Sequence, residues 1–206
     1  MANSIPHPPN NLIDRFDIDF MPSEELHEWV GNMFIKPKSK LFNEDHSHLI
    51  SGSIGFIWTT CNNVTKGKRV LGMAEIFNAR SNKWVKGRQE QQLRDWFGGI
   101  PDFIITIDAH FWRSASNPER FALIEHELYH CGQAHDEFGA PRFSSETGKP
   151  LFAIRAHDVE EFIGVVQRYG AEATGIKEIV DAANKGPSIA PAKIEGLCGT
   201  CQKKVA

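Results

Sequence analysis

The chain has 206 residues, of which 41% are hydrophobic and 24% are charged, and its formal net charge is -3. These values indicate a soluble globular protein with one domain of ordinary size, and they argue against nucleic acid or a membrane as the main partner. No apolar run approaches the roughly 20 residues that span a bilayer, and MANSIPHPPNN at the N-terminus is not a secretory signal. We therefore expect a cytoplasmic protein whose four cysteines stay reduced.

The N-terminal part of the chain predicts a disordered segment followed by one helix. Residues 1–20 include a stretch rich in proline and asparagine, which we expect to be disordered. Ser23 is a suitable helix N-cap, and apolar side chains recur at helical spacing after it, ending before Pro37. These apolar side chains are Leu26, Trp29, Val30, Met33 and Phe34.

The next hundred residues alternate between strand-like and helix-like patterns. Residues 50–60 (ISGSIGFIWTT) and 69–79 (RVLGMAEIFNA) predict two strands, and residues 89–97 predict a helix. The sequence DFIITIDA at 102–109 is the strongest strand prediction, because its apolar run is nearly continuous. Such a run is typical of a strand that is buried on both faces.

A second well-marked helix is predicted over residues 118–131. Ser116 or Asn117 can cap it, Pro118 suits its first turn, and Gly132 supplies a C-terminal stop. It carries the sequence EHELYHC at 125–131. On a period of 3.6 residues, two histidines of this sequence fall on the side opposite the main apolar stripe.

Those histidines and one glutamate have the spacing of a metal-dependent hydrolase. His126 and His130 are four residues apart, so their side chains can lie about 5–6 Å apart and bind one tetrahedral metal ion. Glu127 lies on a neighbouring face, where its carboxylate can serve as a general base. The HExxH pattern therefore predicts a catalytic zinc site with these two ligands.

A catalytic zinc site needs a third protein ligand, and the residues leave several candidates. His157 opens a second predicted amphipathic helix, and Glu160 or Glu161 on the same helix could substitute for it. His135 is nearest in sequence, but the extended metzincin spacing is not present around it. The alternative for the whole set is a polar helix face with no metal.

Two sequence blocks together resemble the phage metallopeptidase family. They are EHELYHC at 125–131 and HDVEEF at 157–162, and the segments LGMAEIFNARSNKWV and DFIITIDAHFW add to the likeness. The resemblance extends from about residue 20 to 170. It implies a zincin-like domain, zinc binding by His126, His130 and His157, catalysis by Glu127, and a phage or prophage origin, in which case the compartment is the host cytoplasm. A looser similarity links the chain to SprT-like proteases.

The fold that we predict is α+β, with a small and mostly antiparallel sheet. A zincin-like domain would span residues 21–171, with the HExxH helix across the sheet and a second helix supplying the third ligand. Residues 172–206 would form a tail that carries Cys198 and Cys201. This CxxC pair is half of a structural zinc site, which another chain or Cys61 could complete.

The function that we predict is zinc-dependent hydrolysis of peptide bonds in a protein or peptide substrate. One alternative is a non-catalytic binding module that uses zinc for stability, although such a module would not need Glu127. A second alternative is a DNA-associated protease of the SprT-like kind, against which the acidic net charge argues. The sequence does not identify the substrate or the oligomeric state.

Overall fold

The computed structural model describes residues 4–14, 17–65, 67–78, 82–159, 163–173, 176–194 and 197–199. The helices are α1 (Asn10–Ile13), α2 (Glu24–Val30), the π-helix η1 (Gly31–Ile35), the 3₁₀ helix η2 (Glu44–Ser51), α3 (Lys83–Phe97), α4 (Ala109–Ser114), α5 (Asn117–His130), α6 (Ile163–Ala173) and α7 (Lys177–Lys185). The strands are β1 (Phe20–Pro22), β2 (Ile54–Thr59), β3 (Val64–Thr65), β4 (Lys68–Glu75), β5 (Phe103–Asp108), β6 (Cys131–Gln133), β7 (Phe152–Ile154) and β8 (Leu197–Cys198).

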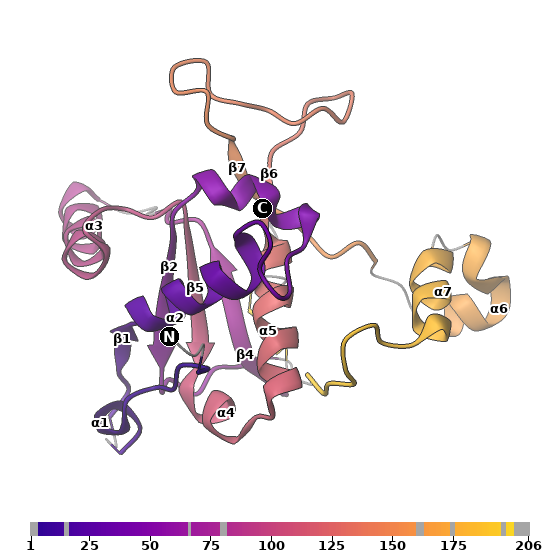
Figure 1. Cartoon of the computed structure of the whole chain (residues 1–206), viewed down its shortest axis with the longest axis horizontal. Helices are drawn as coiled ribbons and strands as arrows, with labels where there is room; N and C mark the ends of the chain where they lie inside the picture. Colours follow the sequence, from indigo (N-terminus) through magenta and orange to yellow (C-terminus); the bar gives the residue numbers. More distant parts are fainter. Residues whose placement is uncertain are drawn as a thin grey trace.

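The main sheet has the strand order β1-β2-β5-β4-β3, and β8 also pairs with β4 (Figure 1). The pairs β1–β2, β4–β5 and β3–β4 are antiparallel, whereas β2–β5 and β4–β8 are parallel. A separate antiparallel hairpin, β6–β7, follows α5. The structure thus confirms the prediction of an α+β fold with a mostly antiparallel sheet.

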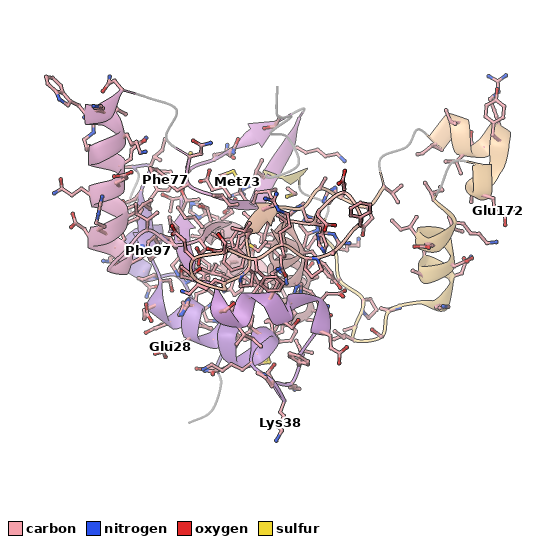
Figure 2. All side chains as sticks on the ribbon, turned by 90° about the horizontal axis from the view of Figure 1, so that it is seen from above. Glu28, Lys38, Met73, Phe77, Phe97 and Glu172 are labelled. Carbon is pink, nitrogen blue, oxygen red and sulfur yellow. The ribbon has the colours of Figure 1, made fainter. Side chains whose placement is uncertain are left out.

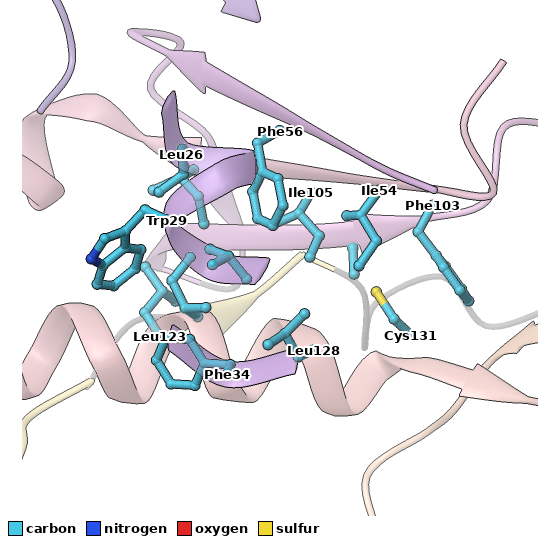
Figure 3. Close-up of a cluster of buried hydrophobic side chains, with 14 of the residues drawn as sticks. Leu26, Trp29, Phe34, Ile54, Phe56, Phe103, Ile105, Leu123, Leu128 and Cys131 are labelled. Carbon is cyan, nitrogen blue, oxygen red and sulfur yellow. The ribbon is translucent and has the colours of Figure 1, made fainter. Parts of the chain in front are cut away.

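Helices cover both faces of this sheet, which explains the continuous apolar runs of β2 and β5. On one face, Phe56 and Ile105 lie in the larger core with side chains of α2, η1 and α5 (Figure 3). On the other face, Ile57 and Ile104 pack with Leu93 of α3. Alternate residues of each strand are therefore buried on opposite faces, as predicted for residues 102–109.

The first predicted helix forms as α2, and Ser23 caps it by accepting a hydrogen bond from the backbone of Leu26 at 3.2 Å. The helix then continues into η1, which also contributes to the core. The first predicted strand is shorter than expected. It begins at Ile54, because the preceding residues form η2.

Both ends of the chain contain helices among the described residues. Within residues 4–14, Leu12 of α1 is fully buried, and the Trp112 indole donates a hydrogen bond to the carbonyl of Pro6 at 2.8 Å. At the other end, α6 and α7 lie apart from the sheet (Figures 1 and 2), and β8 returns to pair with β4. None of the helices in the described ranges has the length and apolar character needed to cross a bilayer.

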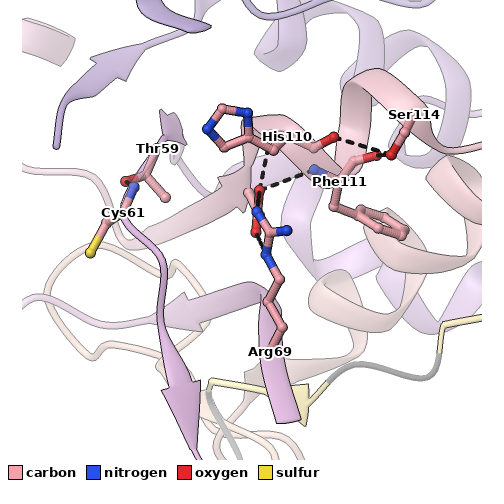
Figure 4. Close-up of polar contacts among 7 residues, drawn as sticks. Thr59, Cys61, Arg69, His110, Phe111 and Ser114 are labelled. Carbon is pink, nitrogen blue, oxygen red and sulfur yellow. Dashed lines mark hydrogen bonds and ion pairs between the residues drawn. The ribbon is translucent and has the colours of Figure 1, made fainter. Parts of the chain in front are cut away.

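A buried carboxylate at the end of β5 holds the turn into α4, and its removal should destabilise the fold. Asp108 accepts hydrogen bonds from the guanidinium of Arg69 (2.8 Å from Nη2) and from the backbone amides of His110 and Phe111, which are drawn in Figure 4. We expect Asp108→Ala to lower the free energy of unfolding by about 2–3 kcal/mol, through the lost cap and ion pair. Asp108→Asn retains a capping oxygen and should cost less, and equal losses in urea unfolding would contradict this account.

Candidate metal centre

Helix α5 presents the two motif histidines, and its start is fixed by a capping box. Ser116 and Glu119 bond each other reciprocally, with the Ser116 amide 2.7 Å from the Glu119 carboxylate. Apolar residues of α5, such as Leu128, are buried in the core. His126 and His130 therefore point together, with their Nε2 atoms 3.3 Å apart. The predicted helix and its histidine pair are both present.

Helix α5 ends within one residue of the predicted position, but Gly132 does not act as the predicted cap. The helix stops at His130, and Gly132 lies within β6 rather than forming a left-handed cap. A Cβ atom on Gly132 would lie 3.1 Å from the Cβ of Arg155 and 3.2 Å from the carbonyl oxygen of Ala153. A side chain at this position would therefore crowd β7 and the residue that follows it, which favours glycine.

His157 joins the pair through the β6–β7 hairpin, not through a second helix. It lies in residues 155–159, which follow β7 and are not helical, with its Nε2 atom 3.3 Å from that of His126. The backbone amide of Arg155 donates to the carbonyl of His130 at 3.0 Å, which aligns this segment beside α5. The prediction that His157 opens a helix was wrong, although the histidine does lie beside the other two.

The same segment fixes the tautomer of one imidazole. The Nδ1 atom of His130 lies 2.7 Å from the carbonyl oxygen of Arg155. Because a carbonyl can only accept, Nδ1 carries the proton and the lone pair is on Nε2, which faces the other histidines. A hydrogen bond from the second ring nitrogen is typical of histidines that bind metal.

Cys198 completes the cluster, and the sequence did not predict this. Its Sγ atom lies 3.1 Å from Nε2 of His130, although 68 positions separate the two residues. The potential ligand atoms of His126, His130, His157 and Cys198 all lie within 4.8 Å of one another. The CGTC sequence indicated that these cysteines could bind metal. Its local spacing could not show that Cys198 lies beside α5 in the fold. Cys201 lies outside the described residues.

The donor set fits a zinc ion. Ligand bonds of 2.0–2.1 Å at tetrahedral angles separate two nitrogen ligands by about 3.3 Å. In the structure, Nε2 of His126 lies 3.3 Å from Nε2 of His130 and 3.3 Å from Nε2 of His157. Imidazole nitrogen and thiolate sulfur are also the donors that zinc prefers in proteins.

Glu127 lies beside the cluster, in a fully buried position between α5 and β4. Burial raises the pKa of this carboxyl to about 8, and the negative charge of Cys198 acts in the same direction. His130 and a hydrogen bond from the backbone of Ala74 oppose the rise in pKa. A divalent cation nearby would lower this pKa again, because positive charge favours the carboxylate.

Gly72 of β4 has no side chain, and the Glu127 carboxylate occupies the position where one would lie. A Cβ atom at Gly72 would lie 2.7 Å from Oε1 of Glu127, which is closer than real Cβ contacts allow. Strand β4 and the motif carboxylate are therefore in direct contact, and the carboxylate faces this strand.

A cavity of about 290 Å³ opens over the histidines, between α5 and the segment after β7. Tyr129 and Arg155 line it together with the three imidazoles, and the Arg155 guanidinium lies 5.6 Å from the centre of the Tyr129 ring. His135 lines a neighbouring cavity and is not part of the metal-ligand cluster. The other candidates for the third ligand, Glu160 and Glu161, lie outside the described residues.

A buried histidine near this cavity should make the fold sensitive to acid. His46 is 1% exposed and packs against the Tyr129 ring, with 4.7 Å between ring centres. Burial lowers the pKa of His46 to about 4, with the charge of His48 as a second cause. As the pH falls below about 6.5, the unfolded chain binds a proton at this site before the folded chain does, so stability present above that pH is lost down to about pH 4.

We therefore expect His46→Phe to resist acid better than the wild type. Between pH 7 and pH 4, the variant should lose less free energy of unfolding than the wild type, by up to about 3 kcal/mol. This amount corresponds to the shift in the pKa of His46. Urea unfolding at several pH values measures it, and both proteins keep the same metal ligands, so the difference isolates this side chain. His110→Phe, at an exposed histidine, is the control. Parallel acid losses in all three proteins would disprove the assignment.

Comparison with known proteins agrees with the resemblance seen in the sequence. Residues 27–184 match the family described as "Putative phage metallopeptidase". No curated protein and no solved structure matched the chain. The matched region includes α5, Glu127 and all three histidines of the cluster, and it ends before Cys198. This protein is therefore a member of the phage metallopeptidase family.

Proposed function

We propose that this protein is a zinc-dependent metallopeptidase that hydrolyses peptide bonds of a protein substrate, encoded by a phage or prophage. The observation that carries the proposal is the convergence of three imidazole Nε2 atoms, 3.3 Å apart in two pairs, beside the buried carboxylate of Glu127. Family membership supports a metal-dependent peptidase, and the donor set supports zinc.

In this proposal His126, His130 and His157 hold the zinc ion. Zinc in such a site polarises the scissile carbonyl and lowers the pKa of a water molecule toward about 7. Glu127 takes a proton from the attacking water and delivers it to the leaving nitrogen. Its burial beside β4 keeps bulk water away from this proton, and Arg155 holds the tautomer of His130 through its carbonyl oxygen.

The substrate would lie in an extended conformation. Strand β4 is in contact with Glu127, and the short strand β8 pairs with it beside this contact. A peptide that pairs with β4 in place of β8 would bring its backbone carbonyls to the carboxylate and the zinc ligands. Tyr129 and Arg155 line the cavity, and the Arg155 guanidinium can donate hydrogen bonds to a substrate carbonyl. An unfolded or loop segment of a protein fits these constraints better than a compact surface.

One observation favours a second candidate, a non-catalytic zinc-dependent binding module. Four potential ligands, including Cys198, lie in the cluster, and structural zinc sites have four protein ligands. The buried general base argues for the enzyme, because a structural site has no use for a carboxylate that carries the cost of burial. The two functions differ in what happens when Cys198 is removed.

Metal content and hydrolysis test the proposal together. We expect about one zinc per chain by elemental mass spectrometry, and its loss in His130→Ala. Cleavage of β-casein, an unstructured protein, should depend on that zinc, stop with a chelator and return on adding zinc back. The assay uses both the wild type and Cys198→Ser, because the thiol lies among the ligands. No metal binding after zinc supplementation would reject the function.

A further inference from the structure

The last described residues of the chain return to the metal centre and bind to the sheet there. Strand β8 pairs in parallel with β4 at Val70 and Gly72, and the amide of Gly199 donates to the carbonyl of Gly72 at 2.9 Å. A Cβ atom on Gly199 would lie 2.8 Å from the Cβ of Met73, so this segment lies closely against β4. Ile194, just before it, packs against the core.

This segment places a thiol where the reaction would take place. The Sγ atom of Cys198 is 3.1 Å from Nε2 of His130 and 3.8 Å from Oε2 of Glu127. A sulfur atom between a zinc ligand and the general base occupies the space that the attacking water needs. The three histidines are sufficient ligands for a catalytic zinc site, so a fourth donor closes its open position.

The segment also occupies the part of β4 that a substrate would use. Among the described residues, β4 pairs with β5 on one side, and on its other side with β3 at Lys68 and Arg69 and with β8 at Val70 and Gly72. Gly72 is the residue in contact with Glu127. An extended substrate and β8 therefore compete for the same backbone groups next to the same carboxylate.

We propose that the described residues 186–194 and 197–199 belong to an autoinhibitory strap, in which Cys198 caps the zinc ion and β8 occupies the side of β4 where a substrate would pair. This inference rests on the proposed function and adds its regulation: the protein is latent until the strap leaves β4. The connection between α7 and β8 is mostly exposed over residues 186–194, so a protease can cut it there and separate the strap from the domain.

Cobalt substitution of the full-length protein tests the cap without any substrate. Cobalt replaces zinc in such sites, and a cysteine thiolate bound to it gives an intense charge-transfer absorption in the near ultraviolet. We expect this band in the wild type, in Cys61→Ser and in Cys201→Ser, and its loss in Cys198→Ser with cobalt still bound. The Cys61 variant is the matched control, because Cys61 is a partly buried thiol outside the cluster.

Acetohydroxamate, a small bidentate ligand for zinc and cobalt, then reports whether the fourth position is open. It should change the visible spectrum of cobalt-loaded Cys198→Ser with at least about tenfold higher apparent affinity than that of the wild type, because only chains with a displaced cap can bind it. β-Casein cleavage should rise by a similar factor. In the zinc-loaded wild type, iodoacetamide should alkylate Cys198 slowly, and a chelator should remove this protection.

Three results would overturn the inference, and each has a distinct consequence for the proposed function. One cobalt per chain without the thiolate band in the wild type would reject the cap and retain the metal site. Loss of metal from Cys198→Ser would make the site a four-ligand structural centre. Equal hydroxamate affinity in the two proteins would show that the thiol does not close the position. By contrast, absence of metal in every variant would reject the proposed function itself.

Discussion

Glu127→Gln should abolish peptide hydrolysis while leaving one zinc ion bound. The amide has nearly the same shape as the carboxylate, but it cannot take a proton from water, and loss of a general base typically lowers the rate by about 10²–10⁴-fold. Glu127 is fully buried and touches β4, so the neutral amide carries no new charge into the core. β-Casein cleavage and elemental metal analysis measure the two quantities in one preparation.

The comparison needs a background in which the fourth position is open. We therefore expect casein cleavage to be lost in Glu127→Gln relative to the wild type. We expect the same loss in the Glu127→Gln, Cys198→Ser double variant relative to Cys198→Ser. Thermal unfolding of both variants should match the parents, which would exclude a folding defect. If the amide variant cleaved casein as fast as its parent with the same zinc content, Glu127 would not be the base.

His157→Ala should remove the metal, and His135→Ala should not. Nε2 of His157 lies 3.3 Å from that of His126, whereas His135 is outside the metal-ligand cluster. Loss of an outer hydrogen-bond partner typically weakens zinc binding by about 10–100-fold, so we expect loss of a ligand to exceed that range. His157 is exposed, so its removal should leave the fold intact.

Competition with a chromophoric chelator measures the zinc affinity of these variants. Zinc should raise the midpoint temperature of thermal unfolding in the wild type. In His157→Ala this rise should shrink in line with the loss of zinc affinity. Glu160→Ala and Glu161→Ala complete the set, because the sequence left both as candidates for the third ligand. Loss of zinc in either glutamate variant or in His135→Ala, with full binding in His157→Ala, would show that the third ligand has been assigned to the wrong residue.

Local sequence patterns were enough to predict the elements whose causes are local. Helix α5 could be predicted because its capping box, Pro118 and apolar period all lie within one stretch of chain, and the spacing of His126 and His130 follows from 3.6 residues per turn. Strand β5 could be predicted from its apolar run, since burial on both faces leaves no polar positions. These parts include two of the proposed zinc ligands and the proposed general base.

The other two residues of the candidate metal cluster reach α5 through contacts between distant segments, and these contacts are visible only in the folded chain. His157 lies beside His126 because the β6–β7 hairpin turns the chain back along α5, and hairpin register depends on contacts between two segments. Cys198 returns through pairing of β8 with β4, across 68 positions from His130. Periodicity and capping act within a few residues, whereas sheet pairing joins distant segments. The histidine pair could therefore be predicted from the sequence, and the position of Cys198 beside it could not.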